Sequence, residues 1–378
     1  MMMLNSVVVL GLVALAGLAG CAMSSKPVEG GAPKLAGSGA ALKADSSGHR
    51  WAIVLHGGAG VIPRDAPAAE VESFQRSLAA ALQVGEERTR RGDQAVDVVE
   101  AVIRVLEEDP NFNAGRGAAF NEKAEHELDA SIMDGRTLAC GGVAGLRTVK
   151  SPIGLARLVM EKTRHVLLAG PGAEEFADAM KVERVANSYF STPKRLEMLK
   201  DVLRERDKAR SARDARNARD GTMVAHEPEA EVVVDAHLLS PGARFATVGC
   251  VVLDVRGNIA AGTSTGGLTG KRFGRVGDSP IIGAGTYASD ATCGVSCTGT
   301  GEEFIRYGVA KDISARMELT GATVNQAAQH VIFKVLKPDD GGVIALSRTG
   351  EIAMVYSSDG MFRAAADSGG LRVVKIWE

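Results

Sequence analysis

The chain has 378 residues, of which 44 are basic and 46 are acidic, so its formal net charge at pH 7 is −2. This balance argues against a globally basic nucleic-acid-binding protein, and five cysteines are too few for a disulfide scaffold. Glycine is abundant, with 45 residues, whereas aromatic residues make up only 4%, and the absence of a Gly-X-Y period excludes collagen.

An apolar run over residues 7–20 opens the chain. It is shorter than the ~20 residues that a membrane-spanning helix needs, and it is typical of a signal-peptide core. It ends in Leu18-Ala19-Gly20-Cys21, which resembles a bacterial lipobox whose cysteine becomes lipidated. We therefore expect a signal peptide over 1–20, lipidation of Cys21 and a flexible tether over 21–50, which would place the protein in a bacterial cell envelope, periplasmic or lipid-anchored. An uncleaved anchor or a misassigned start codon is the alternative, because Met1 to Ser6 carry no Lys or Arg.

The next part of the chain, residues 51–199, alternates predicted strands and helices. Helix-period apolar residues and the Asp109-Pro110 stop define a helix over 95–108. Ser151-Pro152 is a cap and first-turn signal for a helix ending near residue 162. The remaining predictions are a helix over 67–91, a loop over 111–125, and strands over 51–55, 127–133, 138–146 and 166–169.

A charged segment divides the chain into two halves. Thirteen of the residues from 200 to 220 are charged, and large apolar residues nearly vanish there. The composition fits either a solvated helix or a disordered linker, neither of which can pack a core. We treat residues 200–246 as one charged, mobile linker.

The second half, residues 247–378, is rich in predicted strands. Two apolar stretches, 246–253 and 258–264, flank a hairpin turn signal over 254–257. Further strands are expected near 281–288, 342–346, 352–356 and 371–376, and helices over 302–319 and 324–336. Strands in both halves with helices between them predict an α+β layered fold.

Thr247 opens the first of these strands, which by itself is ordinary for a β-branched residue. Its neighbourhood is not ordinary. The charged segment lies directly before it, and the run Gly262-Thr263-Ser264-Thr265-Gly266-Gly267 lies just after it. A later turn, Thr298-Gly299-Thr300-Gly301-Glu302, opens a predicted helix.

These residues belong to an ordered set that resembles the isoaspartyl peptidase/L-asparaginase family, the plant-type asparaginases among the N-terminal-nucleophile hydrolases. Any one glycine motif is weak, but the set occurs in the family's order from about Trp51 to Arg363. Its further members are His56-Gly57-Gly58-Ala59-Gly60, Phe112-Asn113-Ala114-Gly115, His126-Glu127-Leu128-Asp129-Ala130, Thr247-Val248-Gly249 and Gly274-Arg275-Val276-Gly277-Asp278-Ser279-Pro280.

The resemblance implies a four-layer αββα sandwich and a precursor that cuts itself between Ala246 and Thr247. The N-terminal subunit would then end at Ala246, and two cleaved pairs would form a heterotetramer. The chemistry agrees with this, because a threonine hydroxyl is a poor nucleophile unless a base takes its proton. Cleavage would give Thr247 an α-amine with an ordinary pKa near ~7.7–8.0, which suits a general base.

The resemblance also assigns roles to individual residues. Thr265 would orient the new amine, and the Thr298 hydroxyl and Gly299 amide would form an oxyanion hole. Arg275 would bind the substrate α-carboxylate and Asp278 its α-ammonium; a surface ion pair between the two is the alternative. The rest of the implied substrate site is Val276, Gly277, Thr300, Gly301 and Asn113.

No cofactor is implied for catalysis, but the loop over 106–116 resembles the family's sodium-binding loop. Carbonyl oxygens suit a hard cation, although a plain ordered loop is the alternative. The implied ligands are the main-chain carbonyls of Leu106, Glu107, Asp109, Phe112, Ala114 and Arg116.

His56, His126 and His165 are expected to be hydrogen-bonded core histidines, because the proposed base is the Thr247 amine. Cys140, Cys250, Cys293 and Cys297 are expected to pack as buried small residues, and pairing of Cys293 with Cys297 is left open.

The expected activity is amide hydrolysis of β-aspartyl dipeptides and L-asparagine, with release of L-aspartate. The expected partner is this small-molecule substrate, with no nucleic acid, and a membrane would be contacted only through the lipid. A glycosylasparaginase-like amidase is the alternative within the class. A lipid-tethered, non-enzymatic amino-acid-binding protein is the alternative from another class.

Overall fold

A computed structural model describes residues 50–60, 63–219 and 247–377. The predicted signal peptide, the lipidation site Cys21, nearly all of the predicted tether and the residue before the predicted cut, Ala246, lie outside these ranges. Among the described helices, none is both long and apolar enough to cross a membrane.

Twelve described strands form two sheets. The larger sheet has the order β12-β11-β1-β5-β6-β2-β3-β4, and the smaller sheet has the order β10-β9-β8-β7. Neighbouring strands are antiparallel except for the parallel pair β3 and β4. The strands are β1 Ala52–Ala59, β2 Leu128–Asp134, β3 Cys140–Leu146, β4 Leu167–Ala169, β5 Val248–Leu253, β6 Ile259–Thr265, β7 Thr286–Ala288, β8 Cys293–Gly299, β9 Gly341–Ser347, β10 Ile352–Tyr356, β11 Met361–Asp367 and β12 Arg372–Lys375.

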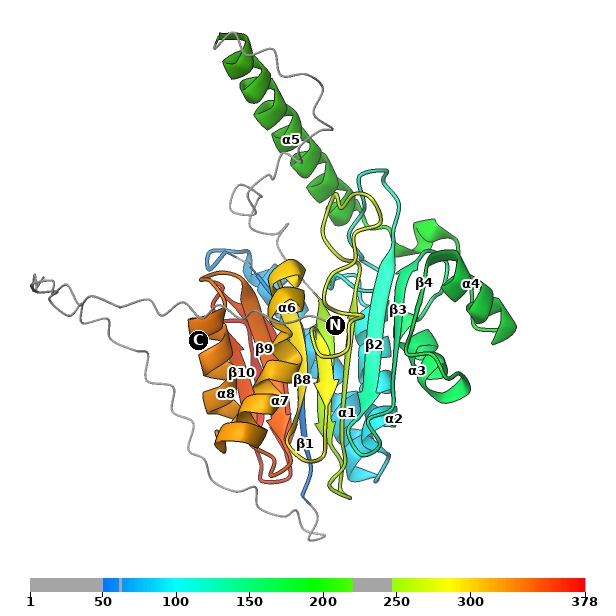
Figure 1. The fold of residues 1–378 in the computed structure, drawn as a ribbon, viewed down its shortest axis with the longest axis vertical. Coiled ribbons are helices and arrows are strands. Elements are labelled where there is room, and N and C mark those ends of the chain that lie inside the picture. Colours follow the sequence, from blue (N-terminus) through cyan, green and yellow to red (C-terminus); the bar gives the residue numbers. More distant parts are fainter. Residues whose placement is uncertain (1–49, 61–62, 220–246, 378) are drawn as a thin grey trace, which may run out of the picture. The chain divides into compact units, whose positions relative to one another are not determined.

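Helices cover the outer face of each sheet (Figure 1). Those of the first half are α1 Ala68–Arg90, α2 Ala95–Glu108, α3 Pro152–Lys162, α4 Gly170–Ala179, the 3₁₀ turn η1 Asn187–Phe190 and α5 Pro193–Arg219. Those of the second half are α6 Gly301–Tyr307, α7 Val309–Thr320, α8 Val324–His330 and the π-helical turn η4 Val331–Val335.

Three apolar clusters separate four layers. One lies between α1, α2 and α3 and the larger sheet, and a second lies between the smaller sheet and α6, α7 and α8. The third cluster lies between the two sheets themselves. The predicted four-layer αββα sandwich is therefore confirmed.

The space between the sheets is apolar at one end and polar at the other. Because side chains alternate along a strand, Val248 and Cys250 of β5 face the helices while Thr247 and Val251 face the second sheet. Val251 joins the apolar cluster between the sheets. At the other end the buried side chains are hydroxyls, including Thr265 and Thr298. This polar end is where a reactive group can be held out of bulk water.

Most of the predicted elements are present, with two differences. The predicted helix over 302–319 is divided into α6 and α7 at Gly308, which has a φ of 56°. Only residues 286–288 of the predicted strand 281–288 are extended as β7. Two strands, β8 and β11, and helix α4 were not predicted.

Helix α5 covers the first part of the predicted linker. It runs from Pro193 to Arg219, so residues 200–219 are helical and a boundary at residue 200 divides a helix. Its first half packs on the protein through the buried side chains of Leu199 and Val202. Arg206 donates a hydrogen bond to the Gly270 carbonyl over 2.7 Å. The charged composition of the second half matches the solvated-helix alternative.

Candidate active site

Thr247 lies directly before β5, and its side chain faces a neighbouring strand, β6. The β5–β6 register pairs Val248 with Ser264, which brings Thr247 next to Thr265. The Thr247 hydroxyl donates to the Thr265 hydroxyl over 3.1 Å. Thr265 also accepts the Gly267 N–H over 3.0 Å, so its own proton can be donated to an amine on Thr247. The structure thus brings together the predicted nucleophile and the residue expected to orient its amine.

A small pocket opens beside this pair. Its volume is about 20 Å³, which is close to the space that one water occupies. The lining residues are Thr247, Thr265, Gly267, Leu268, Arg275, Gly277, Asp278, Ser279 and Gly299.

Asp278 is the buried carboxyl group of the pocket. Its side chain is 4% exposed, and Oδ2 has no hydrogen-bond partner within the described part of the chain. Burial raises the pKa of this carboxyl to about 7, against the opposing effect of Arg275. A buried carboxylate without a partner is costly. A cation placed in the pocket would remove that cost.

Arg275 lines the same pocket, but its ion-pair partner in the structure is Glu302. Nε and Nη2 each lie 2.8 Å from one oxygen of the Glu302 carboxylate. The alternative of an Arg275–Asp278 surface pair is therefore not what the structure shows. Gly277 and Gly301 hold the guanidinium closely, because a Cβ at either position would lie within 3.0 Å of an Nη atom.

The predicted oxyanion-hole residues follow each other at the end of β8. Thr298 is fully buried, and its hydroxyl accepts the Ala59 N–H over 3.0 Å, which leaves the hydroxyl proton for another acceptor. Gly299 lines the pocket beside Thr247. A Cβ on Gly299 would overlap the Asp340 carbonyl, so only glycine fits here.

The other residues predicted for the substrate site lie around the pocket rather than lining it. The Asn113 amide donates to the Gly267 carbonyl over 2.7 Å and accepts the Ala119 N–H, so it holds the loop at Gly267. Thr300 precedes α6, and its N–H donates a hydrogen bond to the Asp340 carbonyl. Val276 lines a separate cavity that adjoins Arg275.

Two of the three histidines are the core residues that we expected. His56 and His126 are fully buried and hydrogen-bonded, and burial lowers the pKa of His56 to about 3 and that of His126 to about 4. His165 differs, since its side chain is exposed. It follows the end of α3, where the chain leaves the core.

The predicted sodium loop closes on itself through its main chain. Arg116 N–H donates to the Glu107 carbonyl over 2.6 Å, and Gly115 packs against the same carbonyl. The Glu107 carbonyl, one of the main-chain oxygens expected to hold the ion, thus accepts a hydrogen bond from within the loop. Among the described residues, no group of His, Cys, Asp or Glu side chains could hold a metal ion.

All four described cysteines have free thiols. Cys250, Cys293 and Cys297 are buried and Cys140 is half-buried. Burial raises the pKa of the Cys293 thiol to about 12. The expectation of small-residue packing is confirmed for the three buried residues, and the structure has no bond between Cys293 and Cys297.

Sequence reasoning missed one buried pair near the pocket. Lys271 is 3% exposed, and its Nζ lies 4.0 Å from Asp129 Oδ2 and donates to the Glu127 carbonyl. Asp129 pairs with Thr265 in the β2–β6 register. The only available signal was the position of Asp129 in its motif, because a charged pair cannot be matched across the chain from composition.

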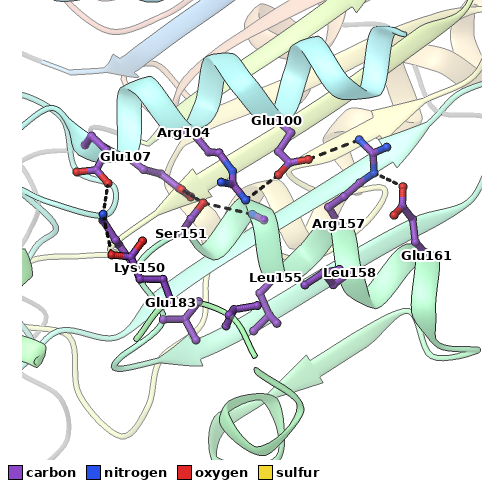
Figure 2. A pocket seen from close by; sticks show the side chains of 14 residues that line it. Glu100, Arg104, Glu107, Lys150, Ser151, Leu155, Arg157, Leu158, Glu161 and Glu183 are labelled. Carbon is purple, nitrogen blue, oxygen red and sulfur yellow. Dashed lines mark hydrogen bonds and ion pairs between the residues drawn. The ribbon is translucent and has the colours of Figure 1, made fainter. Parts of the chain in front are cut away.

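A larger cavity of about 500 Å³ lies elsewhere, between α2 and α3. Its charged side chains pair with one another, as Figure 2 shows for Arg157 between Glu100 and Glu161. None of the residues of the small pocket lines it.

A buried threonine at the start of a central strand, inside an αββα sandwich, defines the class of N-terminal-nucleophile hydrolases. The asparaginase family matches residues 49–376 of this chain. The chain belongs to that family.

Curated relatives cover most of the chain. A probable isoaspartyl peptidase/L-asparaginase 2 of Arabidopsis thaliana is 47% identical over 328 residues, which are 87% of this chain and 99% of the plant protein. The isoaspartyl peptidase of Escherichia coli K12 is 42% identical, over 84% of this chain and 93% of the bacterial protein. The human isoaspartyl peptidase/L-asparaginase is 38% identical, over 84% of this chain and 94% of the human protein.

Proposed function

We propose that this protein is a self-cleaving threonine hydrolase that releases L-aspartate from β-aspartyl dipeptides and L-asparagine. Family membership and relatives that carry both activities in their names support the proposal. One observation on the site carries it: Asp278, whose Oδ2 is buried and has no hydrogen-bond partner among the described residues, lines the pocket that holds Thr247. Every aspartyl substrate of this kind brings an α-ammonium that Asp278 can bind.

The mechanism begins once the Ala246–Thr247 bond is cut and Thr247 has a free amine. The Thr247 hydroxyl attacks the side-chain carbonyl carbon of the substrate, and its proton passes to that amine. The negative oxygen of the tetrahedral intermediate is held by the Thr298 hydroxyl and the Gly299 N–H. The ammonium of Thr247 then returns the proton to the leaving nitrogen as the C–N bond breaks.

The second half of the reaction releases the product. An ester now joins Thr247 to the aspartyl group, and a water attacks its carbonyl while giving a proton to the Thr247 amine. The Thr247 oxygen leaves with that proton, and L-aspartate is released. In this scheme Asp278 binds the α-ammonium of the substrate and Arg275 binds its α-carboxylate. The Arg275 guanidinium, which is paired with Glu302 in the structure, must therefore leave Glu302 or bind both carboxylates when substrate enters.

A denaturing gel and one assay test the proposal together. The wild-type chain should give two bands, with Thr247 as the new N-terminus, and should release aspartate from a β-aspartyl dipeptide. Thr247→Ala should remain one inactive band, and Thr247→Ser, which keeps a hydroxyl, should still be cut. An uncut wild-type chain that binds amino acids without hydrolysing them would instead establish the binding-protein alternative.

The choice between the isoaspartyl and glycosylasparaginase branches rests on the His56-Gly57-Gly58 start and the Gly274–Pro280 run, which favour the isoaspartyl branch. Parallel assays with a β-aspartyl dipeptide and with sugar-linked asparagine distinguish the two. Faster release from the sugar-linked substrate would overturn the assignment.

Three finer proposals accompany this function. The carbonyls of the 106–116 loop would hold a structural sodium ion, which exchange into sodium-free buffer tests through thermal stability. Two cleaved pairs would form a heterotetramer, which light scattering tests. Processing at Cys21 would place the enzyme in the cell envelope, which N-terminal sequencing and membrane fractionation of the full chain test.

A further inference from the structure

A chain of buried side chains begins at the backbone of the nucleophile. His56 Nδ1 lies 2.9 Å from the Thr247 carbonyl oxygen, and His56 Nε2 lies 2.9 Å from the Ser296 hydroxyl. Ser296 in turn lies 2.7 Å from the Thr263 hydroxyl. The three side chains come from β1, β8 and β6, so the chain crosses from the larger sheet to the smaller sheet and back.

The same series of hydrogen bonds continues to the loop that holds Asp278, the residue expected to bind the substrate α-ammonium. The Thr286 hydroxyl donates to Thr263 over 2.6 Å. The Ser131 hydroxyl lies 2.8 Å from Thr286 and 2.6 Å from the Ser279 carbonyl. Ser279 follows Asp278 and lines the small pocket. One continuous series of hydrogen bonds therefore joins two opposite parts of the active site.

The protons of this chain have a defined arrangement. A carbonyl accepts only, so His56 Nδ1 carries the proton that it donates to Thr247. Burial keeps the ring neutral, with its pKa lowered to about 3, so Nε2 accepts from Ser296. Ser296 has then given its only proton to His56, so the 2.7 Å bond between Ser296 and Thr263 takes its proton from Thr263. This bond is shorter than the 3.2 Å contact of the Thr263 hydroxyl with the Gly285 carbonyl.

The hydroxyl protons of Thr286 and Ser131 can be assigned in the same way. Thr286 donates to Thr263, and the proton of Ser131 is shared between Thr286 and the Ser279 carbonyl. Each hydroxyl donates in the direction of His56 except at Ser131, where the acceptors lie on both sides. All five side chains from His56 to Ser131 are 0% exposed, so their hydroxyl and ring groups bond to one another and not to bulk water.

The backbone next to His56 leaves room for this series of hydrogen bonds. Gly249 lies opposite His56 in the β1–β5 register. A Cβ on Gly249 would overlap both the Ser296 hydroxyl and His56 Nε2. The absence of a side chain at position 249 therefore makes room for the His56–Ser296 bond, two residues from Thr247.

We propose that His56, Ser296, Thr263, Thr286 and Ser131 form one positioning network that sets the Thr247 backbone against the Asp278–Ser279 loop. The inference rests on the proposed function, because it assigns the two ends of the network to the nucleophile and to the substrate. None of the five residues is placed in contact with substrate. They act through the residues at the two ends.

The network explains why polar groups occupy this part of the inter-sheet space. The other end of the same space is filled by apolar side chains such as Val251, Leu253 and Ile344. Buried hydroxyls stabilise a fold no better than apolar packing unless all of their bonds are made. A fully connected chain does, however, allow only one relative placement of the strands that carry it.

Two serine-to-alanine variants separate the two ends. Ser296→Ala breaks the link to His56, so we expect kcat to fall about tenfold with KM within about twofold of wild type, and self-cleavage to slow, because both reactions use Thr247. Ser131→Ala breaks the link to Ser279, so we expect KM to rise about tenfold while self-cleavage, which uses no substrate, keeps its wild-type rate.

The centre of the network is tested by an isosteric pair. Thr263→Val removes the hydroxyl and keeps the shape, whereas Thr263→Ser keeps the hydroxyl. We expect Thr263→Val to impair both kcat and KM and Thr263→Ser to restore them. In the double variant Ser296→Ala with Ser131→Ala, kcat/KM should fall by less than the product of the two single effects, because either substitution alone already interrupts the hydrogen-bond network.

The proposal is overturned if the substitutions act independently of one another. Strictly multiplicative effects of Ser296→Ala and Ser131→Ala, or equal kinetics of Thr263→Val and Thr263→Ser, would each show that the hydroxyls only fill space. Thermal unfolding of every variant separates loss of fold from loss of position. An inactive, uncut wild-type chain would contradict the proposed function instead, before any variant is compared.

Discussion

The hydroxyl of Thr247 donates to the hydroxyl of Thr265 over 3.1 Å, across the junction between the start of β5 and the end of β6. Both side chains point into the polar end of the space between the two sheets, where Thr247 is 9% exposed and Thr265 is 3% exposed. A hydroxyl held in this way has a fixed direction, and its partner is already placed beside the position of the future amine.

Thr265 should therefore matter for rate through its hydroxyl and not through its size. We expect Thr265→Val to lower kcat by about tenfold to a hundredfold, since it removes one buried hydrogen bond from the reacting group. Thr265→Ser should retain most of the rate. Single-turnover release of aspartate from a β-aspartyl dipeptide measures this. Equal rates for the valine and serine variants would assign Thr265 to packing alone.

Elements with a strong local pattern were predicted well from the sequence. The helix over 95–108 has the predicted bounds in the structure because its valines repeat with the helical period and Asp109-Pro110 ends it. Strand β8 escaped prediction because Cys293 to Gly299 is a run of small residues with weak strand preference. Gly308 divides the predicted helix over 302–319, since its left-handed backbone cannot continue a helix.

The candidate site was likewise predicted only in part. Thr247, Thr265, Arg275, Gly277, Asp278 and Gly299 were named from ordered motifs, and the structure gathers them around one pocket. The link from His56 to Ser296 joins residues 240 positions apart. No local pattern carries such a contact, because it depends on how the two sheets are stacked. The pairing of Arg275 with Glu302 escaped for the same reason.

Asp278 should discriminate substrates by their α-amine. Asp278→Asn keeps the volume and removes the charge, so we expect kcat/KM for L-asparagine to fall by about tenfold to a hundredfold. Succinamate, which lacks the α-amine, should be hydrolysed at a similar low rate by both proteins. Steady-state kinetics with the two substrates measures the difference. A parallel loss with succinamate would mean that Asp278 shapes the pocket instead of binding the ammonium.

The same carboxyl should make stability depend on pH. Its pKa in the fold is about 7, above its ordinary value of 3.8. Between these values the native chain keeps a proton that the unfolded chain has released, so this group's contribution to stability falls as pH rises towards 7 and stays low above it. In the uncut Thr247→Ala background, we expect Asp278→Asn to raise the thermal midpoint at pH 8 by about a few degrees and to change it little at pH 4.

That experiment has an internal control, because Glu107, whose pKa is also raised to about 7 by burial, is present in both proteins. Its contribution cancels in the comparison. A thermal midpoint that shifts equally at pH 4 and pH 8 would contradict a buried, titrating Asp278.

Thr298 should contribute to the transition state alone. Its hydroxyl accepts from Ala59 N–H and is buried, and its own proton has no acceptor in the described part of the chain, so it can be donated to an oxygen that enters the site. We expect Thr298→Val to lower kcat by about 10²–10³ while KM changes little. Thr298→Ser should retain activity. A KM effect larger than the kcat effect would place the hydroxyl in ground-state binding.

Gly249 should tolerate no side chain, and this prediction tests the packing around His56 directly. A Cβ at position 249 would overlap the Ser296 hydroxyl and His56 Nε2, and overpacking of a buried site costs about 1–3 kcal/mol. We expect Gly249→Ala to lower the thermal midpoint and to abolish self-cleavage. Gly172→Ala in α4 is the matched control, because a Cβ there meets nothing within 4 Å. Since alanine favours a helix over glycine by about 1 kcal/mol, the control should be neutral or stabilising, and a Gly249→Ala chain that cuts itself at the wild-type rate would refute the close contact.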